Sequence, residues 1–193
     1  ILNERKYKVI KNMIQYQCGI YNRFYARNTY VDIVDAIKMK DFYERNNVQG
    51  YRSAKKAFVL KDKKTNEPLM MYSIGHAFFG NGLYSAELAR GACDIDYHGS
   101  GKGIQVIGGA SKLWKNIMEY YENHDIEGEE TQEAINSIVY YIDLRYYSGV
   151  SIDHLMDGET IDDLGTVKQL TSTPSFTNYW RNIESNPVDR RGV

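Results

Sequence analysis

Apolar residues in the first third of the chain recur mostly at helical intervals between residues 29 and 45, and Thr29 is suited to cap the first turn. The apolar positions are Val31, Val34, Ile37 and Phe42. This spacing predicts a first helix, which ends near Asn46 with Gly50 as a stop.

Two shorter apolar runs follow, at 57–60 and 69–74, and a polar stretch with Asn66 and Pro68 separates them. Turn-forming residues between two apolar runs predict an antiparallel hairpin. A further strand is expected over 84–95.

The second half of the chain has a glycine-rich loop at 99–103 and a second amphipathic stretch at 111–123, directly after Gly108-Gly109-Ala110. Its apolar stripe consists of Leu113, Trp114, Ile117, Met118 and Tyr121. Strands are expected at 137–142, 166–170 and 176–180, and a short helix at 151–156. This order describes an α/β domain with a mixed sheet.

Composition narrows the class of protein. With 193 residues, of which 42% are hydrophobic and 25% charged, the chain suits one globular domain. Its 17 Tyr are unusual, and they fit either half-buried strands or base stacking. Cys18 and Cys93 lack the spacing of a metal or redox site, which favours a reducing, cytoplasmic setting. No apolar run approaches the ~18 residues of a membrane span.

Charge is divided unevenly along the chain. Residues 1–64 hold 15 Lys or Arg against 6 Asp or Glu, whereas residues 65–193 hold 9 against 19. A basic half indicates a polyanion partner, and DNA is the partner that we expect. The alternative is a set of solvated strand and turn residues. The residues predicted to bind nucleic acid are Arg52, Lys55, Lys56, Lys63 and Lys64.

The most informative motif is Gln-x-x-Gly-x-Ala, which runs from Gln105 to Ala110 and opens the second amphipathic stretch. A helix start offers free backbone N–H groups and the positive end of the dipole, so it can hold a pyrophosphate. A tight helix entry without a ligand is the alternative. The predicted cofactor-binding residues are Gln105, Gly108, Gly109, Ala110 and Ser111.

This motif resembles the acetyl-coenzyme A pyrophosphate motif of the GCN5-related N-acetyltransferases (GNAT), which lies between the fourth strand and the third helix of that fold. The resemblance implies a mixed, mostly antiparallel sheet flanked by helices, an acyl-coenzyme A cofactor and acyltransferase activity.

A narrower resemblance covers roughly residues 27–180. It is to the GNAT-like domain at the C-terminal end of many phage homing endonucleases, which is similar in turn to the phage DNA-modification protein Mom. The matching segments are 42–50, the hairpin ending in Gly75, 87–90, 106–113, 141–145 with Ser148-Gly149, and 173–179. This resemblance implies action on DNA in a phage-infected bacterial cytoplasm. Arg90, Ser111 and Asp143 match positions that resemble the functional residues of Mom.

Each of these three residues has two interpretations. Arg90 needs an anionic partner if its strand is buried, and that partner is either a substrate or one of Glu87 and Asp143. Ser111 caps a helix, binds a pyrophosphate oxygen, or does both. Asp143 ends an expected central strand, and we interpret it as catalytic together with Arg90, although an ion pair with a neighbouring arginine is the alternative.

Alternating Asp94, Asp96 and His98 would point the same way on an extended strand and could seat a divalent metal. Strand-end acids and an exposed histidine explain the same residues, and we expect no metal.

The leading hypothesis is therefore a GNAT-like acyltransferase acting in DNA modification. The alternative is a non-catalytic DNA-recognition module of a homing endonuclease with its nuclease domain upstream, and a third possibility is a phage accessory protein that binds a host protein. The expected organisation is a basic and aromatic arm or linker over 1–26, the GNAT-like domain over 27–180 and a tail over 181–193.

Overall fold

The computed structural model describes residues 3–77, 86–131, 135, 138–143, 165–170 and 176–182. Two compact units make up the chain, one formed by residues 1–73 with 90–117 and the other by residues 74–89 with 118–193.

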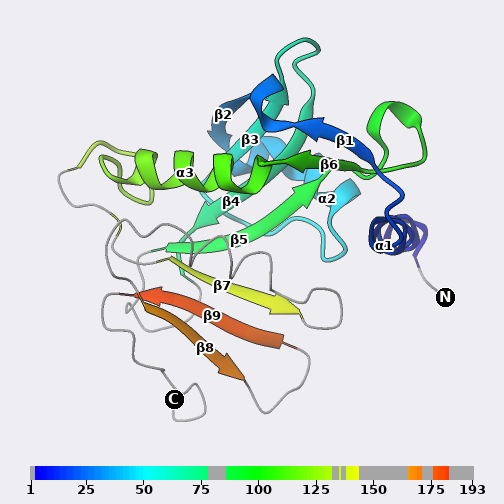
Figure 1. Ribbon diagram of the computed structural model, residues 1–193. Helices are drawn as coiled ribbons and strands as arrows, with labels where there is room; N and C mark the ends of the chain where they lie inside the picture. Colours follow the sequence, from blue (N-terminus) through cyan, green and yellow to red (C-terminus); the bar gives the residue numbers. More distant parts are fainter. Residues whose placement is uncertain are drawn as a thin grey trace. The chain divides into compact units, whose positions relative to one another are not determined.

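The first unit is built on a sheet with the strand order β2–β3–β4–β5 (Figure 1). These strands are β2 (Thr29–Asp35), β3 (Lys56–Asp62), β4 (Pro68–Gly75) and β5 (Ala86–Cys93). Strands β3 and β4 are sheet neighbours joined by a short turn, in which Asp62 N donates to Glu67 O, so they form the predicted hairpin. Asp94 N donates to Leu69 O, which places the end of β5 beside the start of β4.

The predicted helix over 29–45 is wrong in its first half. Residues Thr29–Asp35 form β2, a 3-10 turn η2 (Ala36–Met39) follows, and only α2 (Lys40–Asn46) is α-helical. Strand β2 is antiparallel to β3 over its full length, from Thr29↔Asp62 to Asp35↔Lys56, and we call this strand pair the β2–β3 ladder. Its many β-branched residues suit a pleated strand, and the ladder outweighs the helical spacing. The end of the helix at Asn46 and the left-handed Gly50 are as predicted.

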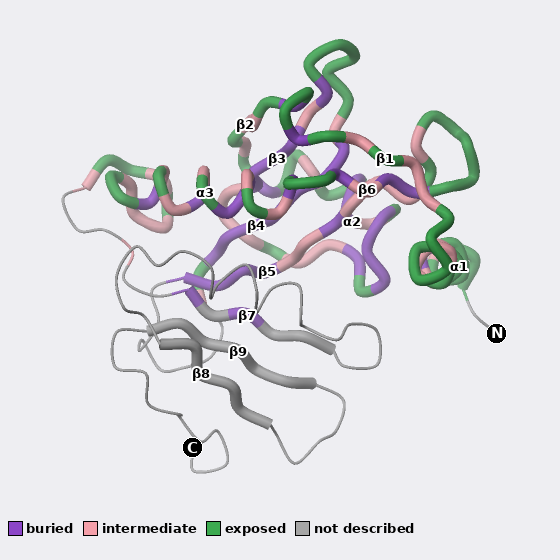
Figure 2. Tube along the Cα trace, viewed as in Figure 1, coloured by how far each residue is buried: buried purple, intermediate pink, exposed green. Residues whose placement is uncertain are grey.

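The core of the first unit lies where β3, β4 and α2 meet, and Figure 2 shows buried residues along these elements. A cluster of buried side chains holds them together: Ala36, Phe42, Tyr43, Ala57, Val59, Met71 and Ala92. Full burial of one large apolar side chain contributes about 1.5–3 kcal/mol, so this cluster stabilises the sheet and α2 as one body.

Residues 22–25 form β1 (Asn22–Tyr25), which pairs in parallel with β6 (Ile104–Ile107) as a separate two-stranded sheet. We call this pair the β1–β6 ribbon. The turn η1 (Ala26–Asn28) connects β1 to β2. The stretch expected as an arm or linker thus contains regular structure that belongs to the first unit.

Helix α1 (Glu4–Gln17) is attached to α2 through Arg5. The Arg5 Nη1 donates to Glu44 O at 3.0 Å and Asn47 O at 2.8 Å, which are carbonyl groups at the C-terminal end of α2. A cation at that position satisfies carbonyls that the helix leaves free and interacts well with the dipole. None of the helices in the described residues is both long and apolar enough to cross a bilayer.

Helix α3 (Gly109–Tyr121) confirms the second amphipathic stretch. Leu113, Trp114 and Ile117 are buried, as the stripe predicts, and Met118 is half-buried. The helix begins two residues earlier than expected, at a glycine.

The second unit contains a run of strands in the order β5–β7–β9–β8. The strands added to β5 are β7 (Ile138–Asp143), β8 (Gly165–Leu170) and β9 (Phe176–Asn182). Strand β7 is parallel to β5 and antiparallel to β9, and β8 is antiparallel to β9. The α/β (α+β) fold with a mixed, mostly antiparallel sheet and flanking helices is confirmed, whereas the helix expected at 151–156 lies outside the described residues.

Candidate functional site

The motif from Gln105 to Ser111 forms a strand, a one-residue turn and a helix start. Gln105 lies in β6, Gly108 has a φ of 74°, and α3 begins at Gly109. A left-handed backbone between a strand and a helix strongly favours glycine at position 108. The sharp turn puts the start of α3 directly beside the end of β6.

Gly109 is required for a different reason, which is close packing. A Cβ atom at this position would lie 2.9 Å from the Cβ of Val106 and 3.0 Å from the sulfur of Met70. The helix start therefore rests on β6 and β4 with no room for a side chain. The backbone of the first turn is held in place by these contacts.

The first turn of α3 is suited to an anion. The hydrogen bonds of the helix begin at Lys112 N, which donates to Gly108 O at 3.1 Å, so the N–H groups of Gly109, Ala110 and Ser111 have no acceptor within the helix. The turn contains no Asp or Glu to offset the positive end of the dipole. Ser111 is exposed, so a ligand can reach this turn from solvent.

Two polar side chains of this region are engaged by the protein itself. The Gln105 Nε2 donates to the Tyr16 hydroxyl at 2.9 Å. The Lys112 Nζ donates to Ala26 O at 3.0 Å and also contacts the backbone and hydroxyl oxygens of Thr29. Phosphate contacts at the helix start would therefore come from backbone N–H groups and Ser111, and the roles of Gln105, Gly108, Gly109, Ala110 and Ser111 stay predictions.

Arg90 is half-buried in β5, in the neighbourhood of Tyr43. Burial raises the pKa of Tyr43, while Ser73 and the positive charge of Arg90 act in the opposite direction. Ser73 Oγ also donates to Arg90 O at 3.5 Å. Arg90 is thus accompanied by a buried phenol that sequence reasoning did not connect with it.

Asp143 is the last residue of β7 and faces Phe176 of β9 in the register. Its side chain lies outside the described residues, so its catalytic role and its expected proximity to Arg90 stay predictions. Glu87 is a candidate that sequence reasoning treated only as a partner for Arg90. Its side chain is fully buried in β5, and buried ionisable groups are concentrated at functional sites.

The five basic residues predicted to bind nucleic acid differ in their surroundings, and their role stays a prediction. Lys56 donates to Asp35 at 3.0 Å, and Lys61, toward the other end of β3, lies 2.6 Å from Asp32. Carboxylates of β2 therefore offset the lysines of β3. Two more of the five predicted residues, Arg52 and Lys55, lie in the segment before β3 and are half-buried.

The turn between β3 and β4 differs from the ladder. The Lys63 Nζ donates to Arg27 O at 3.0 Å, and Lys64 is exposed. Burial lowers the pKa of Lys112, and the charge of Lys63 lowers it further. Lys63 and Lys112 donate to the carbonyl groups of two consecutive residues, Arg27 and Ala26.

Asp94, Asp96 and His98 do not lie on a strand as the alternation suggested. Strand β5 ends at Cys93, Asp96 N donates to Asp94 Oδ1, and His98 lies in the 3-10 turn η3 (Tyr97–Gly99) at 3.4 Å from Glu67. The described residues contain no group of His, Cys, Asp or Glu that could hold a metal ion.

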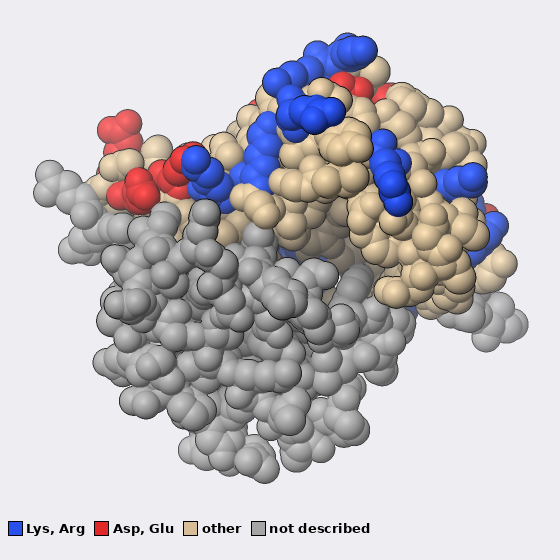
Figure 3. Space-filling model, in the orientation of Figure 1, with Lys and Arg blue, Asp and Glu red and all other residues tan. Residues whose placement is uncertain are grey.

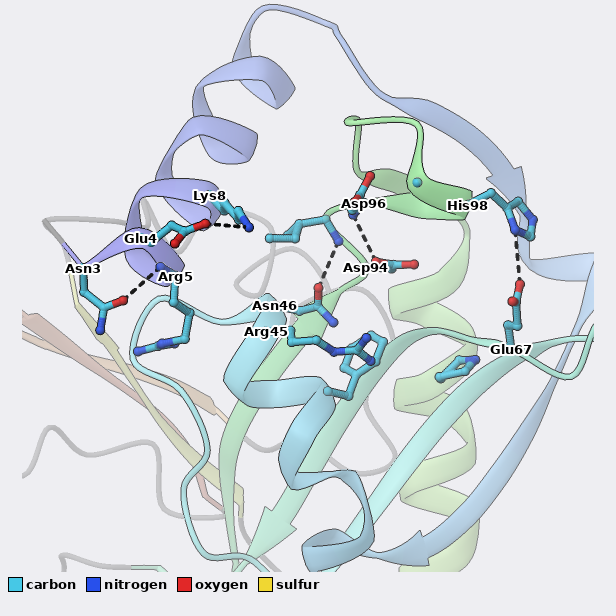
Figure 4. A pocket seen from close by; sticks show the side chains of 14 residues that line it. Asn3, Glu4, Arg5, Lys8, Arg45, Asn46, Glu67, Asp94, Asp96 and His98 are labelled. Carbon is cyan, nitrogen blue, oxygen red and sulfur yellow. Dashed lines mark hydrogen bonds and ion pairs between the residues drawn. The ribbon is translucent and has the colours of Figure 1, made fainter.

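These residues instead line a groove of about 770 Å³ between α1, α2 and the segment after β5 (Figure 4). The Asp94 carboxyl has a raised pKa, mainly because it is half-buried, although the positive charge of Arg45 acts against the rise. Both acidic and basic side chains line the groove. None of its lining residues belongs to the motif at 105–111.

No protein-family model matches this sequence, and no match was found among curated proteins. Solved structures similar to the chain include AtaTR bound with AcCoA, at 11% identity and a TM-score of 0.46, covering 82% of this chain and 96% of that one. Another is the spermidine/spermine N-acetyltransferase SpeG from Vibrio cholerae in complex with manganese ions, at 11% identity and a TM-score of 0.45, covering 81% and 91%. A third is yncA from Salmonella typhimurium with acetyl-CoA, at 12% identity and a TM-score of 0.43, covering 83% and 97%.

Proposed function

We propose that this chain is an acyltransferase of the GNAT type that holds the phosphates of an acyl-coenzyme A at the start of α3. The observation that carries the proposal is the first turn of α3. Three backbone N–H groups there have no acceptor within the helix, no carboxylate lies in the turn, and Gly109 brings the backbone against β6 and β4. Such a turn fits a pyrophosphate.

The order of elements supports the same assignment. Strand β5 is the fourth strand of the larger sheet in chain order, and α3 is the third α-helix. The Gln-x-x-Gly-x-Ala motif lies between them, and the GNAT resemblance expects it at that place. The chain departs from that expected order in one respect. An additional short strand, β6, lies between β5 and α3 and contains Gln105.

The cofactor would supply an activated acyl group as a thioester. The amides of Gly109, Ala110 and Ser111 would hold and orient its phosphates, and positioning of this kind accounts for much of the rate of group transfer. The acceptor amine would attack the thioester carbonyl, so that a C–N bond forms, the C–S bond breaks and coenzyme A leaves as a thiolate that takes up a proton. Asp143 would accept the proton from the attacking amine, and the buried Glu87 is the second carboxyl group proposed for that step. Arg90 would contact an anionic group of the substrate.

We further propose that the acceptor is a nucleic acid, DNA in the first instance. Two features support this part: the excess of Lys and Arg in residues 1–64, and the resemblance of 27–180 to Mom and to phage homing endonucleases. The segments that carry this resemblance include Gly-Gly-Ala-Ser at the start of α3.

Calorimetric titration with acetyl-coenzyme A tests the cofactor assignment, with Ser111→Glu as the informative variant and Ser111→Gln as its matched control. Ser111 is exposed, so neither side chain disturbs packing, and a carboxylate in the first turn stabilises a helix. Because the same carboxylate repels phosphate, Ser111→Glu should weaken binding by about tenfold or more. Ser111→Gln should bind nearly as the unaltered protein does.

Two outcomes would contradict the assignment. Equal loss in Ser111→Glu and Ser111→Gln would mean that bulk, and not charge, matters at this position. Absence of binding at millimolar acetyl-coenzyme A, with DNA binding retained, would replace the enzyme with the non-catalytic recognition module.

A further inference from the structure

The exposed face of β1 carries a short repeat of tyrosine and arginine. Residues 21–27 contain Tyr-x-Arg twice, and alternate residues of a strand share one face. Arg23 and Tyr25 are exposed, whereas the other two residues of β1, Asn22 and Phe24, are half-buried. The Arg23 guanidinium lies 5.9 Å from the ring centre of Tyr21, and that of Arg27 lies 4.6 Å from the ring centre of Tyr25. Rings and guanidinium groups thus alternate from Tyr21, just before β1, through Arg23 and Tyr25 of the strand to Arg27 in η1.

Strand β6 and helix α1 widen this face. The parallel register sets Arg23 beside Gln105 and Tyr25 beside Ile107. The Gln105 Nε2 donates to the hydroxyl of Tyr16 in α1, and the Tyr16 ring centre lies 4.8 Å from that of Tyr21. The exposed fractions of Tyr16 and Tyr25 are 41% and 43%, so both rings are available to a ligand.

The face is positive because carboxylates are missing from the segments that build it. No Asp or Glu occurs between Glu4 and Asp32, nor between Asp96 and Glu119. Figure 3 shows Lys and Arg side chains in a row over the region of the β3–β4 turn, η1 and the start of α3. Among the described residues, the basic side chains of this region for which no ion pair is found include Arg23, Arg27, Lys63 and Lys64.

We propose that this face, formed by Tyr16, Tyr21, Arg23, Tyr25 and Arg27, binds single-stranded nucleic acid. Bases would stack on the tyrosine rings, and phosphates would contact the guanidinium groups and the lysines of the β3–β4 turn. This inference names the acceptor of the proposed acyltransferase and rests on that proposed function for the reaction. The binding of single-stranded nucleic acid itself does not depend on it. The ribbon leads directly into Gly108 and α3, so a strand held here lies next to the proposed cofactor site.

A single strand suits this surface better than a duplex or a membrane does. Stacking on a protein ring requires an unstacked base, which a duplex does not offer. A membrane surface favours several large apolar side chains beside the basic ones. Ile107 is the exposed aliphatic residue of the two ribbon strands, and the exposed Ile14 and Ile20 lie outside the repeat of tyrosine and arginine. Positive charge together with half-exposed rings matches the chemistry of a polynucleotide.

Fluorescence anisotropy with a labelled single-stranded oligodeoxynucleotide of about 16 nucleotides, the upper end of typical site sizes, tests the proposal. Tyr25→Ala should weaken binding roughly tenfold, because it removes one stacking platform. Tyr25→Phe keeps the ring and should bind within about twofold of the unaltered protein. Tyr7→Ala is the matched control, since Tyr7 is an exposed tyrosine of α1 outside the face.

Four results would overturn the inference. The first is absence of oligonucleotide binding, and the second is an equal loss of affinity in Tyr25→Ala and Tyr7→Ala. The third is that a duplex of the same sequence binds as tightly and responds in the same way to Tyr25→Ala. The fourth is that the protein binds anionic vesicles in a manner that depends on Tyr25 and does not bind the oligonucleotide. Circular dichroism of each variant establishes that the fold is retained.

A competition experiment distinguishes this face from the proposed cofactor site. It is needed because coenzyme A also carries an adenine ring and phosphates. Adenosine 3′,5′-bisphosphate should not displace the oligonucleotide, and Tyr25→Ala should leave the affinity for acetyl-coenzyme A unchanged. Displacement, or a parallel loss of both ligands, would assign the face to the nucleotide end of the cofactor. If oligonucleotide binding responds as expected while acetyl-coenzyme A does not bind at all, the face stands and the proposed enzyme falls.

Discussion

The β2–β3 ladder and the β1–β6 ribbon both carry basic side chains, but their surroundings differ. In the ladder, Asp35 lies 3.0 Å from Lys56 and Asp32 lies 2.6 Å from Lys61. In the ribbon, the Arg23 guanidinium lies 5.9 Å from the Tyr21 ring centre, and no ion pair of Arg23 is found among the described residues. The same residue types are therefore offset in one strand pair and left positive in the other.

This difference shows that an excess of Lys and Arg in a sequence does not locate a binding surface. Of the basic residues in the first 64, Arg5 is used to cap α2 and Lys56 is paired across the ladder. The charges available to a polyanion are those left after such internal contacts, and they include Arg23 and Arg27 near the ribbon and Lys64 in the β3–β4 turn. Four experiments would break or sharpen the comparison.

The largest effect on stability should come from Gly109→Val, which adds a side chain where α3 packs against the ribbon. A new Cβ would lie 2.9 Å from Val106 and 3.0 Å from Met70 Sδ, so overpacking should lower the free energy of unfolding by about 3 kcal/mol. Urea denaturation measures this. Gly19→Ala is the control, because Gly19 is also a special glycine, at a φ of 75°, with no atom within 4 Å of a new Cβ, and it should cost only about 1 kcal/mol. Equal losses would mean that the ribbon does not pack closely on the helix.

Lys112→Met should be next in size. The Lys112 Nζ donates to the carbonyl groups of Ala26 and Thr29 and so joins α3 to η1 at the end of the ribbon. Loss of charged hydrogen bonds to a buried carbonyl should lower the free energy of unfolding by about 2 kcal/mol. Thermal or urea unfolding checks this, with Lys115→Met, an exposed position on the same helix, as the control. A result near zero would show that η1 is held by its other contacts.

A smaller effect should appear in the salt dependence of DNA binding. Lys63→Ala with Lys64→Ala should reduce the slope of log affinity against log salt by about one for each lysine, since every phosphate contact releases counterions. Lys56→Ala with Lys61→Ala should change the slope much less, because both charges are offset by β2. Affinities over a series of salt concentrations give the slopes. Equal slopes for the two double variants would contradict the comparison.

The smallest effect should come from Asp35→Asn, which removes a carboxylate from the ladder and leaves the charge of Lys56 less offset. The hydrogen bond and charge of Lys56 lower the pKa of Asp35 below its ordinary value. The pair therefore contributes stability above the unfolded pKa of about 3.9, and that contribution disappears as the pH falls through the lower folded pKa. Urea midpoints of the two proteins should differ slightly at neutral pH and converge in acid. Asp35→Asn should also bind DNA slightly more tightly, and a midpoint difference that persists in acid would rule out this pairing as the cause.

Local patterns predicted several elements well. The stripe of Leu113, Trp114 and Ile117 identified α3, and the polar stretch with Asn66 and Pro68 identified the turn between β3 and β4. Gly108 marked the turn before the helix. These features depend on spacing or on a backbone conformation that few residues adopt, so the sequence alone expresses them.

Other features depended on partners far away in the chain. Residues Thr29–Asp35 have helical spacing but pair along β3, some 27 residues later, and that ladder made them a strand. The alternation of Asp94, Asp96 and His98 suggested one face of a strand, but β5 ends before them. The catalytic assignments of Arg90 and Asp143 stay predictions for the same reason. The spacing of two residues in the sequence does not determine whether they lie close together across a sheet.

What the sequence by itself determined is the inventory: a basic first third, a glycine turn that opens an amphipathic helix, and two stretches without Asp or Glu. What only the tertiary structure decided is which of the basic residues keep their charge exposed. Asp32 and Asp35 lie some 20 to 30 residues from Lys61 and Lys56 in the chain, while Tyr21, Arg23 and Gln105 come together only through the parallel pairing of β1 and β6. Electrostatic pairing acts over a few ångströms of space, whatever the separation along the chain, and so the fold selects the surface that a polyanion can reach.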